Sequence, residues 1–489
     1  MRKRSDTMGR TDFVSANNLW CQKDFTEAER VVKLVKDSGL EVIRLSYPDQ
    51  HGMLRGKTIM ASEIEQALRN GCALTTTLLA KDTSHTTVFP VFSPGGGFGI
   101  PEMENAGDFI AVPVPNTFRL LPWAPGTGWI LCDGYLANGE PVPFSTRQIL
   151  KNALSSLEDS GLDYIAGIEV ECHVYRLEDP MLQPENAGQP AHPPRVSLIA
   201  RGYNYLTELR MDELDPVFEI VRRELLALRL PLRTMETEFG PSQFEFTFAP
   251  APGLEAADNM VLFRNAVKQI CRRNGYHATF MCRPGLPNAF ASGWHLHQSL
   301  EHRSDGANAL APNRSEKLLS SIGMSFAAGI LQNAPGAMVF TTPTVNGYKR
   351  YKPNSLAPDR IVWGRDNKGA MLRVVSAGPG DPATRIENRV GEPAANPYLY
   401  IASQVLSGLH GLTNELVPPA ITDDPYASSA EHLPTNLIDA VNALDKSTMF
   451  RKALGNRFVD YFLTIKRAEI ARYLSTVSDW EHREYFELF

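Results

Sequence analysis

The chain has 489 residues, a formal net charge of −6 at pH 7 and 43% hydrophobic residues. This size can bury more than one core, and the composition is typical of a globular protein rather than a disordered one. The slightly acidic balance gives no general attraction to nucleic acid or to an anionic membrane, so we expect neither as a partner.

The N-terminal residues are basic but are not followed by the apolar stretch of a secretory signal. No apolar run in the sequence reaches the roughly 18 residues that a membrane span requires. The six cysteines show no Cys-x-x-Cys pairing. We therefore expect free thiols and a cytoplasmic location.

The first part of the chain predicts a flexible arm followed by a small domain. Residues 1–25 are polar and predict the arm. A capping-box pattern from Thr26 to Glu29, followed by apolar residues and Gly39, predicts one helix. Strands are expected at 40–46, 108–114 and 128–135, with loops at 47–57 and 93–105. Together these elements predict a small β-rich domain over residues 26–136.

A second, larger domain is expected over residues 143–489, after a stretch from Asn138 to Pro143 that has the composition of a linker. Helices are expected at 146–160, 212–229, 255–275, 315–333, 393–410 and 435–445. Polar strands lie between them, and residues 178–195 are typical of a surface loop. This order predicts an α+β domain with a largely antiparallel sheet.

Four short stretches of this domain alternate ionisable and apolar side chains. In a strand, residues i and i+2 face the same side, so each stretch directs its polar side chains to one surface. A solvated strand face explains any one stretch alone about as well as a functional site does, but not all four together. Carboxylates with imidazole suit divalent cations, and neighbouring arginines suit phosphate or carboxylate. The stretches contain Glu169 and Glu171; Glu238 and Glu245; His295 and His297; and Arg385, Glu387 and Arg389.

The neighbours of these residues sharpen the prediction. Three phenylalanines alternate with the polar residues around Glu245, so its strand must pack one face into a core. Glu238 precedes a Gly-Pro turn and can fold back onto the same surface. His173 follows Glu171 at the same spacing, and a structural or pocket-lining role is expected for it rather than metal ligation. The four stretches predict a site where metals, a nucleotide and an acidic substrate meet.

From about residue 39 to the C-terminus, the order of the motifs resembles the glutamine synthetase superfamily, in particular its γ-glutamylamide-forming branch. The motifs lie at 167–171, 238–245, 292–300, 343–350, 385–389 and 392–398. The resemblance implies a small N-terminal β-grasp domain and a catalytic domain with a curved antiparallel sheet flanked by helices. It also implies two stacked hexamers with active sites between neighbouring subunits. The implied reaction phosphorylates the γ-carboxylate of glutamate with ATP, and an amine then displaces the phosphate.

The resemblance further implies roles for single residues, with two or three Mg²⁺ or Mn²⁺ ions in the site. One ion would be held by Glu171, Glu238 and Glu245, and a second by Glu169, His295 and Glu387. ATP would be contacted by His297 and Arg385, with Ser299 nearby. Glutamate would be bound by Arg350, Arg389 and Glu171. The transferred phosphoryl group would be neutralised by the catalytic residues Arg373, Lys368 and Arg389.

The chain departs from ammonia-using members of the superfamily at the positions that handle ammonium. Leu356 stands where they carry a glutamate, Arg55 begins the segment where they carry Asp-Gly-Ser, and Phe290 replaces an asparagine. Trp294 replaces a methionine. Ammonium needs surrounding oxygens, whereas apolar walls desolvate an organic group. We therefore expect these four residues to line a pocket for an organic amine, with aniline or an alkylamine favoured.

Other substrates stay open at this point. A polyamine or ethanolamine is the alternative, because Asp49, Glu102 and Glu104 could serve a cationic amine. A true ammonia-using enzyme and a non-catalytic glutamate or nucleotide sensor are less favoured. A sensor would have little reason to keep six metal ligands facing one another.

Overall fold

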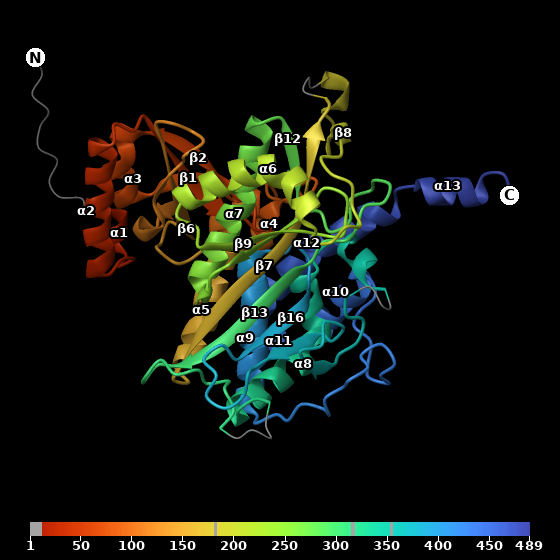
Figure 1. Ribbon diagram of the computed structural model, residues 1–489. Helices are drawn as coiled ribbons and strands as arrows, with labels where there is room; N and C mark the ends of the chain where they lie inside the picture. Colours follow the sequence, from red (N-terminus) through yellow and green to blue (C-terminus); the bar gives the residue numbers. More distant parts are fainter. Residues whose placement is uncertain (1–11, 180–182, 314–317, 353–355) are drawn as a thin grey trace, which may run out of the picture. The chain divides into compact units, whose positions relative to one another are not determined.

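The computed structural model describes residues 12–179, 183–313, 318–352 and 356–489 (Figure 1). The chain forms two compact units. The N-terminal unit contains residues 1–80 and 89–148, and the C-terminal unit contains residues 81–88 and 149–489. Residues 1–11 of the predicted arm, 180–182 of the predicted surface loop and 315–317 of the helix predicted at 315–333 lie outside the described residues.

The N-terminal unit contains a mixed six-stranded sheet in the order β2-β1-β6-β4-β3, with β5 paired to β6. β1 and β6 run parallel, and the other neighbouring strands run antiparallel. The strands are β1 (Val42–Pro48), β2 (Leu54–Met60), β3 (Cys72–Thr75), β4 (Asp108–Pro113), β5 (Arg119–Leu120) and β6 (Thr127–Tyr135). The helices are α1 (Phe13–Ala16), α2 (Gln22–Asp37), α3 (Ile64–Asn70) and α4 (Gly96–Gly99).

Three predictions for this unit were wrong. The helix expected to begin at the Thr26 capping box begins at Gln22, and its capping box is formed by Cys21 and Asp24. Residues 12–25 are not a flexible arm, because α1 and the start of α2 occupy them and Val14 is fully buried beside Val112 and Tyr135. Apolar residues of this segment, among them Phe13, Leu19 and Trp20, pack against that buried cluster. Residues 54–57 are not part of a turn but open β2, and there Gly56 has no room for a side chain, since a Cβ would lie 1.7 Å from the Leu45 carbonyl oxygen.

The C-terminal unit is built on a ten-stranded, largely antiparallel sheet, as the sequence predicted. Its main path is β14-β15-β16-β13-β7-β10-β9, and β8, β11 and β12 also pair with β7. Only β14 and β15 run parallel within the described sheet. The strands are β7 (Leu162–Leu177), β8 (Val196–Ser197), β9 (Leu232–Thr237), β10 (Gln243–Phe248), β11 (Ala251–Pro252), β12 (Tyr276–Thr279), β13 (Trp294–His302), β14 (Trp363–Arg365), β15 (Leu372–Val375) and β16 (Arg385–Gly391).

Helices pack on the apolar face of this sheet. Phe246 of β10 meets the rings of Phe218 in α6 and Phe263 in α7, which fixes the outward direction of the polar residues that alternate with it. The helices are α5 (Thr146–Glu158), α6 (Glu208–Ala227), α7 (Gly253–Arg273), α8 (Ser321–Thr341), α9 (Pro397–Thr413), α10 (Leu437–Lys446), α11 (Thr448–Leu454), α12 (Asn456–Leu474) and α13 (Asp479–Tyr485). None of the described helices is both long and apolar enough to cross a membrane.

In the C-terminal unit, the six helices predicted up to residue 446 correspond to α5–α10, but one was displaced along the chain. The helix expected at 315–333 begins at Ser321, where the Ser320 side chain caps it, and continues through Pro335 to Thr341. The proline does not end it because neighbouring helices bury this segment almost completely. The three helices after residue 446 were not predicted.

Candidate active site

Residues of all four polar stretches lie on neighbouring strands, in the order β16, β13, β7, β10, with Glu238 on the turn between β9 and β10. Strand register places their ionisable residues directly opposite one another. Glu169 pairs with His295, Glu171 pairs with Glu245, and His297 pairs with Glu387. The sheet therefore assembles one polar surface from segments more than 200 residues apart in sequence.

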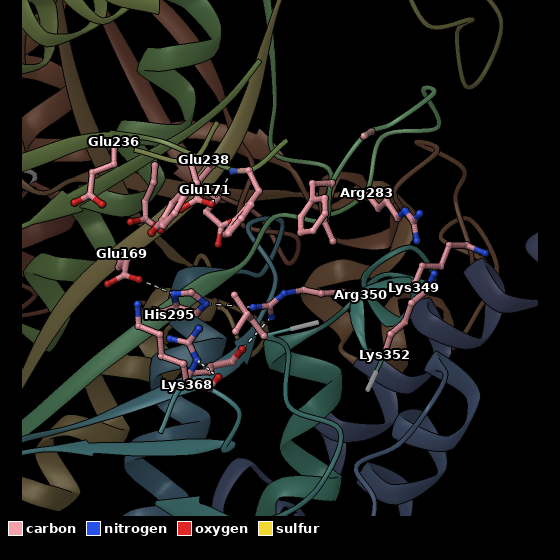
Figure 2. A pocket seen from close by; sticks show the side chains of 18 of the residues that line it. Glu169, Glu171, Glu236, Glu238, Arg283, His295, Lys349, Arg350, Lys352 and Lys368 are labelled. Atoms are coloured by element: carbon pink, nitrogen blue, oxygen red, sulfur yellow. Dashed lines mark hydrogen bonds and ion pairs between the residues drawn. The ribbon is translucent and has the colours of Figure 1, made fainter. Parts of the chain in front are cut away.

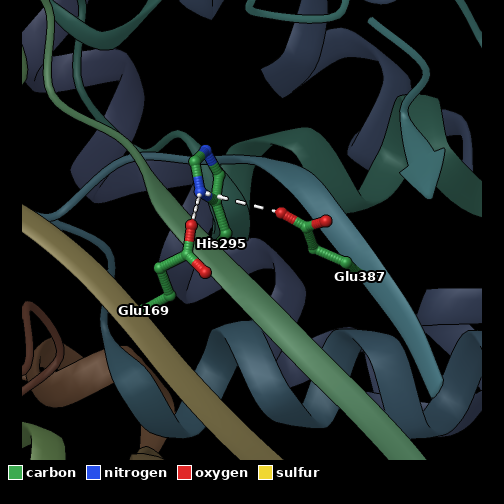
Figure 3. Close-up of side chains that lie close together, drawn as sticks. All are labelled: Glu169, His295 and Glu387. Atoms are coloured by element: carbon green, nitrogen blue, oxygen red, sulfur yellow. Dashed lines mark hydrogen bonds and ion pairs between the residues drawn. The ribbon is translucent and has the colours of Figure 1, made fainter. Parts of the chain in front are cut away.

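The first group of ligands consists of Glu169, His295 and Glu387 (Figure 3). One potential ligand atom from each lies within 4.8 Å of the others. Nδ1 of His295 is 2.7 Å from Oε1 of Glu169 and 3.7 Å from Oε1 of Glu387. This is the triad that the sequence predicted for one metal ion.

The second group consists of Glu171, Glu245 and again His295, whose ligand atoms also lie within 4.8 Å of one another. Glu238, predicted to join Glu171 and Glu245, lines the same pocket but is not part of this tight group. The structure thus brings together all six predicted ligands, with His295 between the two groups.

The carboxylates of the second group are held in an environment that disfavours their charge. Burial, followed by the charge of Glu238, raises the pKa of Glu171 to about 8. Burial and the charges of the other acids raise the pKa of Glu245 to about 10. Neither carboxylate has an ion pair with the described lysines and arginines. Oxygen donors with one imidazole fit a hard divalent cation such as Mg²⁺ or Mn²⁺, which would offset this repulsion.

In contrast, the Glu387 carboxylate is tightly paired with arginines. Nη1 of Arg373 donates to its Oε2 at 2.9 Å, and Nη1 of Arg389 pairs with its Oε1. Burial alone would raise the pKa of Glu387, but the nearby His295 and Arg389 lower it below its usual range. The predicted phosphoryl-neutralising arginines thus also hold a predicted metal ligand in place.

A pocket of about 330 Å³ opens onto this surface, lined by residues of the C-terminal unit. Figure 2 shows Glu169, Glu171, Glu236 and Glu238 on one side, with lysines and arginines facing them. The predicted glutamate-binding and phosphoryl-neutralising cations that line the pocket are Arg350, Lys368, Arg373 and Arg389. Arg350 connects these cations to the ligand groups, because its Nη2 is 3.2 Å from Nε2 of His295.

The predicted nucleotide-contacting residues lie next along the same strands. Nε2 of His297 is 3.1 Å from Oε2 of Glu169, and Nε of Arg385 donates to Nδ1 of His297 at 3.2 Å. The Ser299 hydroxyl donates to the Thr384 carbonyl oxygen at 3.3 Å. None of the three lines the pocket of Figure 2. His297 adjoins it at Glu169, and Arg385 follows behind His297.

The four residues predicted for the amine pocket have different outcomes. Leu356 and Phe290 line the pocket and are 49% and 39% exposed. The prediction for Trp294 was wrong, because it is fully buried on the opposite face of β13, against the ring of Tyr400. Strand alternation requires this, since the adjacent His295 faces the pocket. Arg55 belongs to the N-terminal unit and donates to Asp49 at 2.8 Å, so its role in the amine pocket stays a prediction.

A buried network behind the second ligand group was missed. The Gln243 amide donates to Oε2 of Glu171 at 2.8 Å and to the Ser292 hydroxyl at 3.1 Å. The Ser292 hydroxyl is in turn 3.3 Å from Nδ1 of His173, which is fully buried. The i+2 spacing of Gln243 from Glu245 was a usable signal. The expected structural role of His173 fits this position.

Other pocket residues were also missed. Glu236 alternates with Glu238 and could have been found by the same spacing argument. Tyr205 lies on a loop whose sequence gives no such signal. The missed lining residues include Tyr205, Glu236, Phe239, Arg283 and Lys352.

Comparison with known proteins gives a consistent result. The family model described as "Glutamine synthetase, catalytic domain" matches residues 143–485. Gamma-glutamylanilide synthase from Acinetobacter sp is 45% identical, over 98% of this chain and 99% of its own. Glutamate–isopropylamine ligase from Pseudomonas sp is 30% identical, over 94% and 98%.

Among solved structures, one titled "GmaS/ADP complex-Conformation 1" superposes with a TM-score of 0.77 at 26% identity, covering 94% of this chain and 99% of that one. Sequence, site geometry and fold agree: the chain belongs to the glutamine synthetase family.

Proposed function

We propose that this protein is an ATP-dependent ligase that joins L-glutamate to an organic amine, with a neutral aromatic amine such as aniline favoured. The observation that carries the proposal is the composition of one pocket. A buried acid–imidazole cluster and several cations lie beside the apolar side chains of Leu356 and Phe290. The near full-length similarity to gamma-glutamylanilide synthase supports it.

The activation step makes use of the polar part of the pocket. Arg350 and Arg389 would orient the carboxylates of glutamate, and Lys368 and Arg373 would offset the negative charge of the transferred phosphoryl group. His297, Ser299 and Arg385 would hold the nucleotide beside Glu169. Two Mg²⁺ or Mn²⁺ ions held by the two ligand groups would supply further charge neutralisation.

The amine then attacks the activated γ-carbonyl carbon, the bond from that carbon to the phosphate oxygen breaks, and the departing phosphate can accept the proton that the nitrogen loses. An alkylamine is an ammonium ion at neutral pH and must lose a proton before it attacks, whereas aniline is already neutral. A neutral aromatic amine therefore needs no carboxylate where Leu356 stands, and it gains from leaving water for an apolar surface.

The alternative site for a cationic amine is less well supported. The Asp49 carboxylate is buried and accepts hydrogen bonds from its own turn and from Arg55. Glu104 accepts a hydrogen bond from the Gly95 amide at 3.0 Å. Both acids therefore already stabilise the backbone of the N-terminal unit.

A direct test is ADP release by the purified protein with ATP, Mg²⁺, glutamate and one amine at a time. The amines would be ammonium, putrescine, ethanolamine, isopropylamine and aniline. We expect kcat/KM to be highest for aniline. Turnover with ammonium equal to that with the organic amines would contradict the proposal, and no turnover with any amine would favour a sensor.

We also propose that the protein works in the cytoplasm as a ring-shaped homo-oligomer, most simply two stacked hexamers. All six cysteines are free thiols, which suits a reducing compartment. Light scattering on the purified protein would test the assembly. A monomer at micromolar concentration would contradict it.

A further inference from the structure

We propose that Tyr205, Phe239 and Phe290 form an aromatic wall that selects the amine, admitting a neutral aromatic ring in preference to a small or cationic aliphatic group. The inference rests on the proposed ligase function and names residues that determine its specificity. Phe239 and Tyr205 were not singled out by the sequence, and only Phe290 was expected in this pocket.

The three rings form a continuous stack along the pocket. The centroids of Tyr205 and Phe239 are 4.4 Å apart with an interplanar angle of 7°, and those of Phe239 and Phe290 are 5.8 Å apart at 25°. All three rings line the same pocket as Glu171 and Glu238. Burial raises the pKa of Tyr205, and the charges of Glu238 and Glu245 raise it further, in keeping with its place in the same pocket as these acids. The wall therefore runs from the acid cluster to the apolar mouth at Phe290.

The stacking decides what the wall can recognise. Phe239 is stacked on two other rings, so it presents mainly its edge to the pocket. Ring edges carry a partial positive charge and attract the electron-rich face of another ring. Cations prefer ring faces, which the stack partly covers. A neutral, electron-rich ring such as that of aniline thus fits this wall better than an alkylammonium ion does.

Backbone hydrogen bonds fix the wall, and one of them links it to a predicted metal ligand, because the Phe239 amide donates to Oε2 of Glu238 at 3.1 Å. The Tyr203 amide donates to the Phe239 carbonyl oxygen at 2.8 Å, and the Ile199 amide donates to the Ser242 hydroxyl at 2.8 Å. A Cβ at Gly240 would lie 2.8 Å from Cβ of Phe290, so the close approach of that ring to the turn requires glycine. The loop carrying Tyr205 and the turn carrying Phe239 are thereby locked together.

The test compares amines that separate ring from basicity. Aniline and methoxyamine are both weakly basic and neutral at pH 7, but methoxyamine has no ring. Cyclohexylamine has a ring of similar size but is a cation. Initial rates would be measured with the full-length protein, ATP, Mg²⁺ and saturating glutamate.

The variants are Phe239→Leu, Tyr205→Leu and Phe290→Leu. Tyr205→Phe keeps the ring, and Tyr473→Leu serves as a control at an exposed tyrosine of α12.

We expect each leucine variant of the wall to lower the ratio of kcat/KM for aniline to that for methoxyamine by roughly three- to tenfold. The ratio of aniline to cyclohexylamine should fall as well. Tyr205→Phe should keep the wild-type ratio of aniline to methoxyamine, and Tyr473→Leu should not change it. Because Tyr205 and Phe290 are partly exposed, at least these two leucine variants should fold.

Equal losses with aniline and methoxyamine, or unchanged ratios in all three leucine variants, would overturn the inference. Equal losses with a raised half-saturation concentration of Mg²⁺ would show that Phe239 acts by holding Glu238 and would overturn it too. If the wild type uses methoxyamine but not aniline, the wall inference fails and the ligase function stands. If the wild type uses no amine at all, the proposed function itself fails.

Discussion

Glu387 is a buried carboxylate whose burial is energetically unfavourable and whose position the proposed metal site requires. Its side chain is fully buried, and burying a carboxylate is unfavourable unless cations and hydrogen bonds compensate it. Arg373 and Arg389 each pair with one of its oxygens, and His295 lies beside it. The same contacts fix the orientation of the carboxylate toward the ligand group with Glu169.

We predict that Glu387→Gln lowers kcat/KM by about 100-fold or more and weakens metal binding, because it removes a ligand and leaves two guanidiniums partly unpaired. Steady-state kinetics and Mg²⁺ titration would measure both effects. Glu301→Gln, on the same sheet but outside the site, is the matched control. Wild-type Mg²⁺ affinity in Glu387→Gln would contradict the assignment of this residue.

A single substitution at Leu356 tests the proposed choice of amine. We expect Leu356→Glu to lower kcat/KM for aniline about tenfold relative to ethanolamine, which corresponds to roughly 1.4 kcal/mol. The reason is that a carboxylate at the apolar mouth favours a cation over a neutral ring. Leu356→Ala, which adds no charge, is the comparison. An unchanged amine profile in Leu356→Glu would show that this side chain does not contact the amine.

At the scale of elements, β7 and β10 place two glutamates directly opposite each other. Glu171 and Glu245 are register partners, and like charges in such positions destabilise a sheet. The phenylalanines of β10 hold the strand in this register, because they fill the core on the other face. Core packing on one face of β10 therefore offsets the repulsion between the two glutamates on the other face.

The pH dependence of stability should report this repulsion. The pKa of Glu171 is raised to about 8 and that of Glu245 to about 10, mainly by burial, whereas a glutamate in an unfolded chain ionises near pH 4.3. The folded state thus binds more protons than the unfolded state, so the free energy of unfolding falls as pH rises from about 5 to 8.

We predict that, in EDTA, the Tm of the wild type falls between pH 6 and pH 8 and that Glu245→Gln reduces this fall. Adding Mg²⁺ should raise the wild-type Tm by a few degrees, most at pH 8, and the Tm of the variant by less. Thermal unfolding with and without Mg²⁺ measures both. An identical Mg²⁺ shift in Glu245→Gln and wild type would show that Glu245 is not a ligand.

At the scale of the whole molecule, a short segment between the two parts of the N-terminal unit belongs to the C-terminal unit. Residues 81–88 belong to the C-terminal unit. Asp82 is buried there and accepts hydrogen bonds from the Ser84 and Thr86 amides and from Arg472 of α12, at 2.9 Å from Nη2. This carboxylate joins an early segment of the chain to one of its last helices.

We predict that Asp82→Asn lowers the free energy of unfolding by about 1–3 kcal/mol at pH 7, since it removes the charged acceptor from this set of donors. Burial would raise the pKa of Asp82, but the hydrogen bonds from Ser84, Thr86 and Arg472 outweigh it and lower that pKa. The stabilisation is therefore present above the unfolded-state pKa and lost as pH falls through the folded-state value.

Urea unfolding of wild type and variant at pH 7 and under acid conditions would measure this, with Asp305→Asn in an exposed loop as the control. We expect the difference between wild type and Asp82→Asn to shrink in acid. A difference that grows in acid would contradict the assignment.

The sequence by itself determined the fold class, the family and the composition of the polar site. This was possible because a strand has a period of two residues. The i, i+2 spacing alone therefore places Glu169 with Glu171, and His295 with His297, on one face without any tertiary contact. Applied to Trp294, the same rule places it on the opposite face from His295, so its wrong assignment to the amine pocket was avoidable from the sequence. The packing of residues 12–25 was missed because the buried Val14 packs against Val112 and Tyr135, which lie far along the chain.

Only the tertiary structure decided what lies across the strands and around the pocket. Register placed His295 between two ligand groups and paired Glu387 with Arg373, and these contacts join residues too distant in sequence for any periodicity to connect. The aromatic wall arises where the loop at Tyr205 docks on the turn at Phe239 and meets Phe290. Loops have no repeating geometry, so their contacts depend on the completed fold.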